Sequence, residues 1–168
     1  MKHFTTYIKD TTQVVATLKF EGGFPPEMID EIPKENGIYA AFACVEYEDC
    51  YECRRLIYLG KAEGENDSIH DRIDDHIKDR DESDSGKQSF WERNYLAEDE
   101  KIVYSYAVYD NNLADIESAL IRRNQPEANI QSKDCYLGKA WHVFVKCQGE
   151  KGTISEENSV WKLIRGSK

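Results

Sequence analysis

The sequence predicts an α+β domain, and three observations support that prediction. Segments rich in β-branched and aromatic residues are mixed along the chain with segments of helical periodicity. The 168 residues, 40% of them hydrophobic, are enough to bury one core. No repeat and no Gly/Ser- or Pro-rich linker divides the chain, so we treat residues 1–168 as a single domain.

The first third of the chain predicts three strands. Residues 12–20 are rich in β-branched side chains and predict a strand, which the glycines and prolines of residues 22–26 end. The apolar run 37–45 predicts a second strand. An acidic turn that carries cysteines then leads to a short third strand at 56–59.

A helix is predicted next, because Ser68 and Asp71 have the spacing of a capping box. It should run to about Arg80 and be followed by a loop over residues 81–89.

The remainder predicts a second helix and three further strands. Asn111 or Asn112 caps the helix, which ends near Arg123 ahead of a proline. The strands are expected at residues 101–109, 141–147 and 160–164.

Charge is distributed unevenly along the chain. The formal net charge of −10 argues against a generic nucleic-acid coat protein, because phosphate neutralisation needs clustered Lys and Arg. Residues 62–100 hold 14 acidic and five basic residues, whereas residues 133–168 hold seven basic and four acidic ones. A local nucleic-acid surface is compatible with this composition, and an extended one is not.

Localisation and cysteine chemistry can also be inferred. The longest apolar run is far shorter than the ~18 residues of a membrane span, and no apolar signal-peptide core follows Met1, so we expect a cytoplasmic protein that does not bind membranes. Five cysteines, an odd count, argue against a disulfide framework. Cys50 and Cys53 have the spacing of one zinc half-site, but no second pair follows at a comparable spacing. We therefore favour reduced thiols over zinc.

Both predicted helices carry polar residues on their apolar stripe. In the first, Arg72 and His76 share the face of three isoleucines, and in the second Glu117 lies within a Leu/Ile stripe. A buried charge is costly unless it is paired, bound to metal or facing a cleft. Each side chain could instead reach water from the edge of its stripe. Two helices that break the pattern together favour a site.

The dipeptide Ile-Tyr occurs at residues 38–39 and again at 57–58, in neighbouring predicted strands. Because side chains alternate along a strand, Tyr39 and Tyr58 face the same way if both isoleucines face the core. Gly37 and Gly60 flank these dipeptides and would leave the backbone open to a ligand. Two tyrosines alone are also typical of an ordinary sheet surface.

Taken in order, these residues resemble the GIY-YIG nuclease superfamily. The matching positions are Gly37-Ile38-Tyr39, Tyr58-Leu59-Gly60, Arg72, His76, Glu117, Pro126 and Asn129. The resemblance covers residues 33–130, with a strand extension at 1–32 and a C-terminal strand arm at 133–168. It implies a small, mainly antiparallel central sheet flanked by helices. The departures are Leu59 in place of the usual Ile, the acidic hairpin and the net acidity.

The resemblance further implies phosphodiester hydrolysis with one divalent cation. Glu117 matches the metal-binding glutamate, and its oxygens suit Mg²⁺ or Mn²⁺. Tyr39 matches the tyrosine at the attacking water, as general base or as its orienting partner. A phenol with a pKa of about 10 is a poor base unless a cation lowers that pKa. Arg72 matches the arginine that holds the scissile phosphate.

Four more residues receive roles from the resemblance. His76, one helical turn after Arg72, would accept or relay the proton from Tyr39. Tyr58 matches the second tyrosine, which contacts the phosphate or orders water. Lys61 and Asn129 are expected to bind substrate, with Asn129 alternatively bracing the metal site.

The expected partner is nucleic acid, with DNA favoured. A unit of this size resembles the restriction-type or small uncharacterised branches of the superfamily. Restriction-type members commonly pair or tetramerise, so a homodimer is compatible with the resemblance. One alternative is a catalytically inactive GIY-YIG scaffold that binds nucleic acid or protein, although the principal positions are all filled. Another is a zinc-stabilised interaction domain built on Cys50 and Cys53. Substrate type, sequence preference and biological role are not encoded in any motif.

A single site makes a geometric prediction. The two tyrosines should lie on one sheet face, and the charged residues of the flanking helices should complete one cleft. We expect the basic arm 133–168 to contact nucleic acid, and residues 62–100 to face away from it apart from Arg72 and His76.

Overall fold

The structure, a computed structural model, describes residues 12–78 and 94–162. The described elements are β1 (Gln13–Phe24), the 3₁₀ helix η1 (Pro26–Glu31), β2 (Gly37–Glu46), β3 (Tyr51–Ala62), α1 (Ile69–Lys78), β4 (Glu100–Val108), α3 (Leu113–Asn124), β5 (His142–Gly149) and β6 (Glu157–Trp161). All six strands form one sheet in the order β3-β2-β4-β1-β5-β6. Only the β1–β5 pairing among them is parallel. The predicted α+β class is confirmed.

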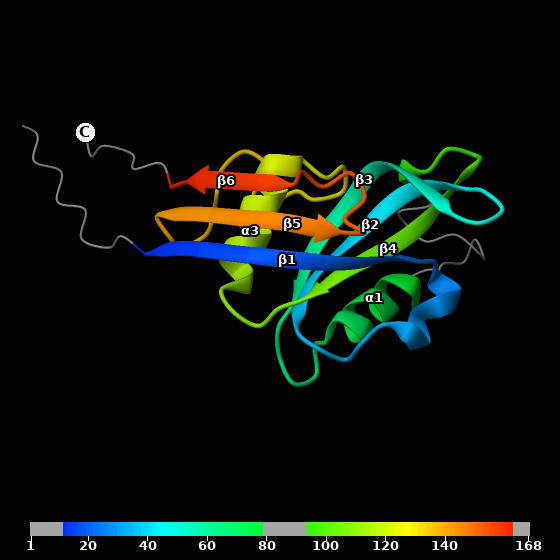
Figure 1. Ribbon diagram of the computed structural model, residues 1–168, viewed down its shortest axis with the longest axis horizontal. Helices are drawn as coiled ribbons and strands as arrows, with labels where there is room; N and C mark the ends of the chain where they lie inside the picture. Colours follow the sequence, from blue (N-terminus) through cyan, green and yellow to red (C-terminus); the bar gives the residue numbers. More distant parts are fainter. Residues whose placement is uncertain (1–11, 79–93, 163–168) are drawn as a thin grey trace, which may run out of the picture.

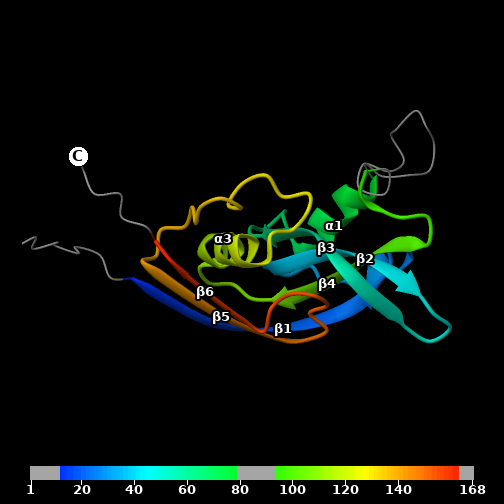
Figure 2. The same ribbon diagram turned by 90° about the horizontal axis from the view of Figure 1, so that it is seen from above.

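Strand β1 joins the two halves of the sheet. Its first part, Gln13 to Phe20, pairs with β5, and its last part, Glu21 to Phe24, pairs with β4. At Gly22 a Cβ would collide with side-chain and backbone atoms of the neighbouring segments, so glycine is needed where β1 passes from one partner to the other. Figure 1 shows this long strand crossing the molecule, and Figure 2 shows the sheet curving around α3.

The two helices pack on opposite faces of β2. Alternate residues of β2 belong to two hydrophobic clusters, Ile38 to the one formed with α3 and Tyr39 to the one formed with α1. Ile69 and Ile73 of α1 are fully buried, as are Ile116 and Leu120 of α3. The apolar stripes predicted from helical spacing therefore do face the core.

Strand β3 is much longer than the predicted 56–59. It begins at Tyr51, opposite Glu46 of β2, and its first residues alternate between half-buried and exposed positions. Charged side chains such as Glu52 and Arg54 can face water there because β3 is an edge strand. The 3₁₀ helix η1 was not predicted, and the expected loop 81–89 and the end of the last strand lie outside the described residues.

One predicted helix cap is confirmed and the other is wrong. The Ser68 hydroxyl donates to Oδ2 of Asp71 at 2.7 Å, and the backbone N–H of Asp71 donates to the Ser68 hydroxyl at 3.2 Å. At the start of α3, Asn112 is left-handed (φ 52°), and its side chain makes no capping bond. None of the helices within the described ranges is long and apolar enough to cross a membrane.

Candidate active site

Tyr39 and Tyr58 lie on the same face of the sheet, although not for the expected reason. Tyr39 and Ile57 belong to the cluster under α1, against which Tyr58 packs, whereas Ile38 faces α3. A β-bulge leaves Ile57 without a partner residue in β2. The expectation that both isoleucines face the same side is therefore wrong, because the bulge reverses the alternation between Ile57 and Tyr58.

Three rings form an aromatic cluster at this face. The Tyr39 hydroxyl lies 3.1 Å from Nε2 of His76. The ring centroids of Tyr39 and Tyr58 are 6.0 Å apart, and the Tyr58 and His76 rings meet edge-on at 5.3 Å. Tyr39 is fully buried, whereas Tyr58 and His76 are half-buried. Of the three rings, only those of Tyr58 and His76 have exposed surface.

The glycines of the two tripeptides serve packing inside the protein. A Cβ on Gly60 would lie 2.5 Å from the Tyr39 hydroxyl oxygen, so glycine makes room for this phenol. A Cβ on Gly37 would collide with the carbonyl of Ala107 in β4 and approach Ile69 of α1. Instead of admitting a ligand, as the sequence suggested, these glycines admit a buried tyrosine and a neighbouring strand.

Tyr39 is held in its neutral form. Burial raises the pKa of its hydroxyl well above the ordinary value, and the neighbouring Tyr58 raises it further. Arg72 acts in the opposite direction, but its effect is smaller than that of lost hydration. Of the two expected roles for Tyr39, this favours orienting or relaying over acting as a general base.

Arg72 offers hydrogen-bond donors beside the cluster. Its charge lowers the pKa of the Tyr39 hydroxyl, and its Nε lies 3.5 Å from Oδ1 of Asp67. Nε is buried and forms no hydrogen bond with a described residue, while the side chain as a whole is 41% exposed. The exposed part of this guanidinium can bind an anion, whereas the buried Nε faces Asp67 inside the protein.

Glu117 of α3 lies on the opposite face of the sheet from Arg72 and the aromatic cluster, at the edge formed by β3. Its Oε1 accepts a hydrogen bond from the backbone N–H of Lys61 in the edge strand β3, at 3.2 Å. Burial raises the pKa of Glu117, whereas Lys61 and Arg72 lower it. Burial also raises the pKa of Tyr58, and the charge of Glu117 adds to that increase. Glu117, Arg72 and Tyr58 are thus electrostatically coupled across β3.

The expected single cleft is only partly formed. Tyr39, Tyr58, Arg72 and His76 gather on one face. Glu117 instead lines a pocket of about 480 Å³ around the start of α3, and none of those four residues belongs to it. The structure therefore places Glu117 outside the cluster, in a separate pocket, and the expectation of a single cleft is wrong for this residue.

Asn129 braces the edge of β3. Its Oδ1 accepts from the N–H of Leu59 and its Nδ2 donates to the carbonyl of Leu59, both at 2.9 Å, so the side chain imitates a neighbouring strand. The next free backbone N–H along this edge, that of Lys61, is the one bound by Glu117. Because its amide is engaged with Leu59 and nearly buried, we assign Asn129 to bracing rather than to the expected substrate contact.

Acidic residues lie closer to the site than expected. Asp67 pairs with Arg72, and Glu63 pairs with the Lys61 ammonium at 2.6 Å and raises the pKa of Glu117. The expectation that residues 62–100 face away is therefore wrong for these two. Sequence reasoning missed Asp67 and Glu63, although both lie in the acidic loop between Gly60 and α1. Because the Lys61 ammonium pairs with Glu63, the phosphate contact expected of Lys61 competes with the Lys61–Glu63 ion pair.

The chemistry of a hard-cation ligand is present at Glu117. Within the described ranges no group of three or more His, Cys, Asp or Glu side chains is arranged to hold a metal ion. Three carboxylates line the pocket that contains Glu117, but Glu63 pairs with Lys61. Asp115 accepts hydrogen bonds from Tyr136 and from the backbone N–H of Lys139. Glu117 alone therefore fits Mg²⁺ or Mn²⁺, which use one or two carboxylates and keep several waters. Cys53 contacts Cys44 rather than Cys50.

Comparison with models of known families, with curated proteins and with solved structures gives no match.

Proposed function

We propose that the chain is a GIY-YIG-type endonuclease that hydrolyses phosphodiester bonds of nucleic acid, with DNA as the favoured substrate. The observation that carries this proposal is the contact between a neutral, fully buried tyrosine and a half-buried histidine, beside an arginine with an unsatisfied N–H. Burying polar side chains such as these lowers the free energy of unfolding relative to an apolar cluster at the same face. A catalytic role accounts for that loss of stability.

Arg72 binds the scissile phosphate in this proposal. The guanidinium can direct two N–H groups at the non-bridging oxygens of the phosphate. The same groups stabilise the negative charge that develops on the phosphate oxygens in the transition state. Asp67 and Tyr39 hold the guanidinium in place. Tyr58, which is half-buried, orders the attacking water at the open side of the cluster.

His76 is the final proton acceptor. As water attacks phosphorus, we assign its proton a route through the Tyr58 hydroxyl, whose ring packs beside that of Tyr39, and then through the Tyr39 hydroxyl to Nε2 of His76. Each phenol gives up one proton as it receives another, so no phenolate forms. This route suits the raised pKa of Tyr39, which disfavours a phenolate.

Glu117 would hold the divalent cation. When bound, a divalent cation supplies Lewis-acid stabilisation of the phosphate and its leaving oxygen. The Lys61 N–H fixes one carboxylate oxygen and leaves the other available. Burial disfavours the charged carboxylate, and a cation would offset that penalty.

The test is cleavage of supercoiled plasmid, linear duplex and RNA by the full chain with Mg²⁺, Mn²⁺ or EDTA. Glu117→Gln keeps the shape of the side chain, so we expect roughly a 10²–10³-fold loss of rate with folding and nucleic-acid binding retained. Glu52→Gln, at an exposed surface pair with Arg54, is the matched control and should cleave normally.

Two results would contradict the proposal. Cleavage that survives Glu117→Gln belongs to a contaminant or another site. Salt-sensitive binding without cleavage of any of the three substrates identifies an inactive scaffold instead.

A further inference from the structure

The β2–β3 hairpin carries three of the five cysteines, and two of them face each other. Cys44 of β2 and Cys53 of β3 are partners in the strand pairing, with their sulfurs 2.7 Å apart. Cys44 is fully buried and Cys53 is half-buried, while Cys50 is exposed in the turn. Among the described residues this is the only contact between two thiols.

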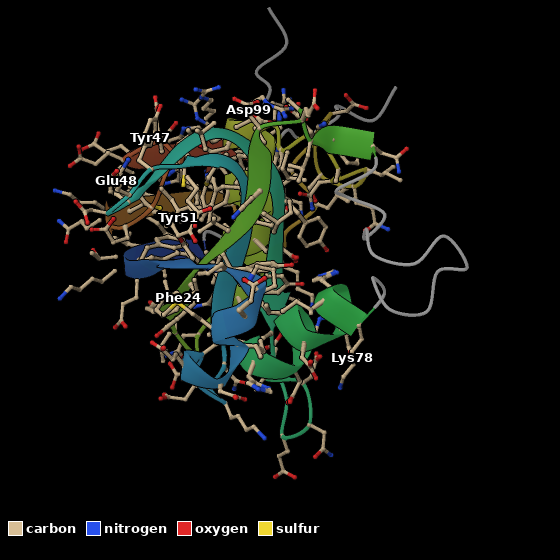
Figure 3. The ribbon with its side chains drawn as sticks, turned by 90° about the vertical axis from the view of Figure 1, so that its right-hand side faces the viewer. Phe24, Tyr47, Glu48, Tyr51, Lys78 and Asp99 are labelled. Atoms are coloured by element: carbon tan, nitrogen blue, oxygen red, sulfur yellow. The ribbon has the colours of Figure 1, made fainter. Side chains whose placement is uncertain are left out.

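Cys53 opens into an acidic pocket of about 560 Å³ at the end of the hairpin. Four carboxylates line this pocket, those of Glu46, Glu48, Asp49 and Glu150. Lys101 pairs with Glu46, and the described residues that line the pocket include no lysine, arginine or histidine. Figure 3 shows Glu48 between Tyr47 and Tyr51 at this end of the hairpin, on the opposite side of the view from Lys78.

The two thiols differ in reactivity. The hydrogen bond from the Cys44 thiol lowers the pKa of Cys53, whereas that contact and burial raise the pKa of Cys44. The thiolate is the attacking form, so Cys53 is the nucleophile on grounds of both access and ionisation.

We propose that Cys44 and Cys53 form a reversible thiol–disulfide site, oxidised by small cationic disulfides that enter the acidic pocket. The Cys53 thiolate attacks one sulfur of the incoming disulfide and forms a mixed disulfide with it, while the original S–S bond breaks. The other sulfur leaves as a thiol after taking up the proton that Cys53 released. Cys44 then attacks the Cys53 sulfur of the mixed disulfide, and its proton goes to the second departing thiol. Two protein thiols and one disulfide thus give one Cys44–Cys53 bond and two small thiols.

Cys135 provides an internal control of opposite charge. It is exposed and lines a different pocket, together with Arg122, Arg123, Lys162 and the single acid Asp134. Anionic disulfides should therefore favour Cys135, while cationic ones favour Cys53. Cys135 contacts no second thiol among the described residues that could displace a bound thiol, so Cys135 should keep its adduct.

The experiment treats the reduced full chain with cystamine, whose amines are protonated, or with oxidised glutathione, which is net anionic. Samples are quenched with an alkylating agent and mapped by mass spectrometry. At low salt we expect cystamine to oxidise Cys53 about tenfold faster than oxidised glutathione, with the order reversed at Cys135. The product should be a Cys44–Cys53 crosslink without retained adduct, and high salt should reduce both preferences.

Variants separate this pairing from its rivals. Cys50→Ser should leave the crosslink intact, and Cys53→Ser should abolish it. Cys44→Ala should convert Cys53 into a stable mixed disulfide, and a thermal melt checks that this variant folds. A Cys50–Cys53 crosslink, or an adduct retained on Cys53 in the unmodified chain, would overturn the pairing of Cys44 with Cys53. Oxidation of Cys53 by oxidised glutathione as fast as, or faster than, by cystamine would overturn the preference for cations. None of these readouts depends on nuclease activity.

Discussion

Helices α1 and α3 lie on opposite faces of β2 and bring different chemistry to it. Under α1 the buried side chains include a tyrosine that hydrogen-bonds a histidine and whose pKa is lowered by the charge of a nearby arginine. Under α3 the buried side chains are almost all aliphatic, and Glu117 reaches past them to the edge of β3. The α3 face therefore supplies stability, whereas the α1 face gives up part of its apolar packing for a polar cluster.

The largest loss of activity is expected on the α1 face, at His76. His76→Ala removes the final proton acceptor, so the cleavage rate should fall roughly 10²–10⁴-fold with a small change in melting temperature. Tyr39→Phe breaks the relay at its middle and should cost a similar factor. Single-turnover rates of the two variants measure this. A much larger loss for Tyr39→Phe than for His76→Ala would instead identify the tyrosine as the base.

Arg72→Ala should reduce the cleavage rate roughly 10²–10³-fold and weaken nucleic-acid binding as well. The guanidinium is proposed to contact phosphate before and during the reaction, so both quantities depend on it. Arg54→Ala is the matched control, because Arg54 is exposed on the same strand as Tyr58 but pairs with surface acids. If Arg72→Ala and Arg54→Ala show the same nucleic-acid affinity and the same cleavage rate, Arg72 has no role in the active site.

The α3 face should respond in the opposite way. Leu120→Ala deletes a fully buried side chain and should destabilise the fold by about 2–5 kcal/mol. Activity per folded molecule should stay close to that of the unmodified chain, because Leu120 touches the core and not the polar cluster. Urea unfolding and active-site titration separate the two effects. A loss of specific activity in the folded fraction would show that the two faces are coupled.

The smallest effect is expected on the pH dependence of the free energy of unfolding, to which the buried carboxyl of Glu117 contributes. Because burial raises its folded-state pKa, Glu117 contributes stability that is present below its unfolded pKa and lost as pH rises through its folded pKa. Glu117→Gln removes this titration, so the variant should gain stability relative to the unmodified chain as pH increases from acidic to neutral. Urea unfolding at several pH values measures the difference. A difference that is constant with pH would contradict the raised pKa.

The same contrast explains how much the sequence could predict. Helical spacing identified the buried faces of both helices, and the polar interruptions at Arg72, His76 and Glu117 were visible because they break that spacing. Capping chemistry located the start of α1 through Ser68 and Asp71.

Other features depend on pairing between strands, which local patterns do not encode. The bulge at Ile57 arises from the register between β2 and β3, and it changes which side chains share a face. The length of β3 was underestimated because an edge strand tolerates charged residues. The role of Gly60 beneath the Tyr39 ring and that of Asn129 against Leu59 are contacts between segments distant in sequence.

The central claim is that residues from both faces form one cation-dependent site across the edge of β3. Titration of the full chain with Mn²⁺, followed by NMR, tests it directly, because this paramagnetic ion broadens the signals of nearby nuclei. We expect the Lys61 amide and the Tyr58 ring to broaden first, and Glu117→Gln to abolish that broadening. Broadening that begins instead at the acidic hairpin around Glu48, and that is unchanged in Glu117→Gln, would contradict the claim.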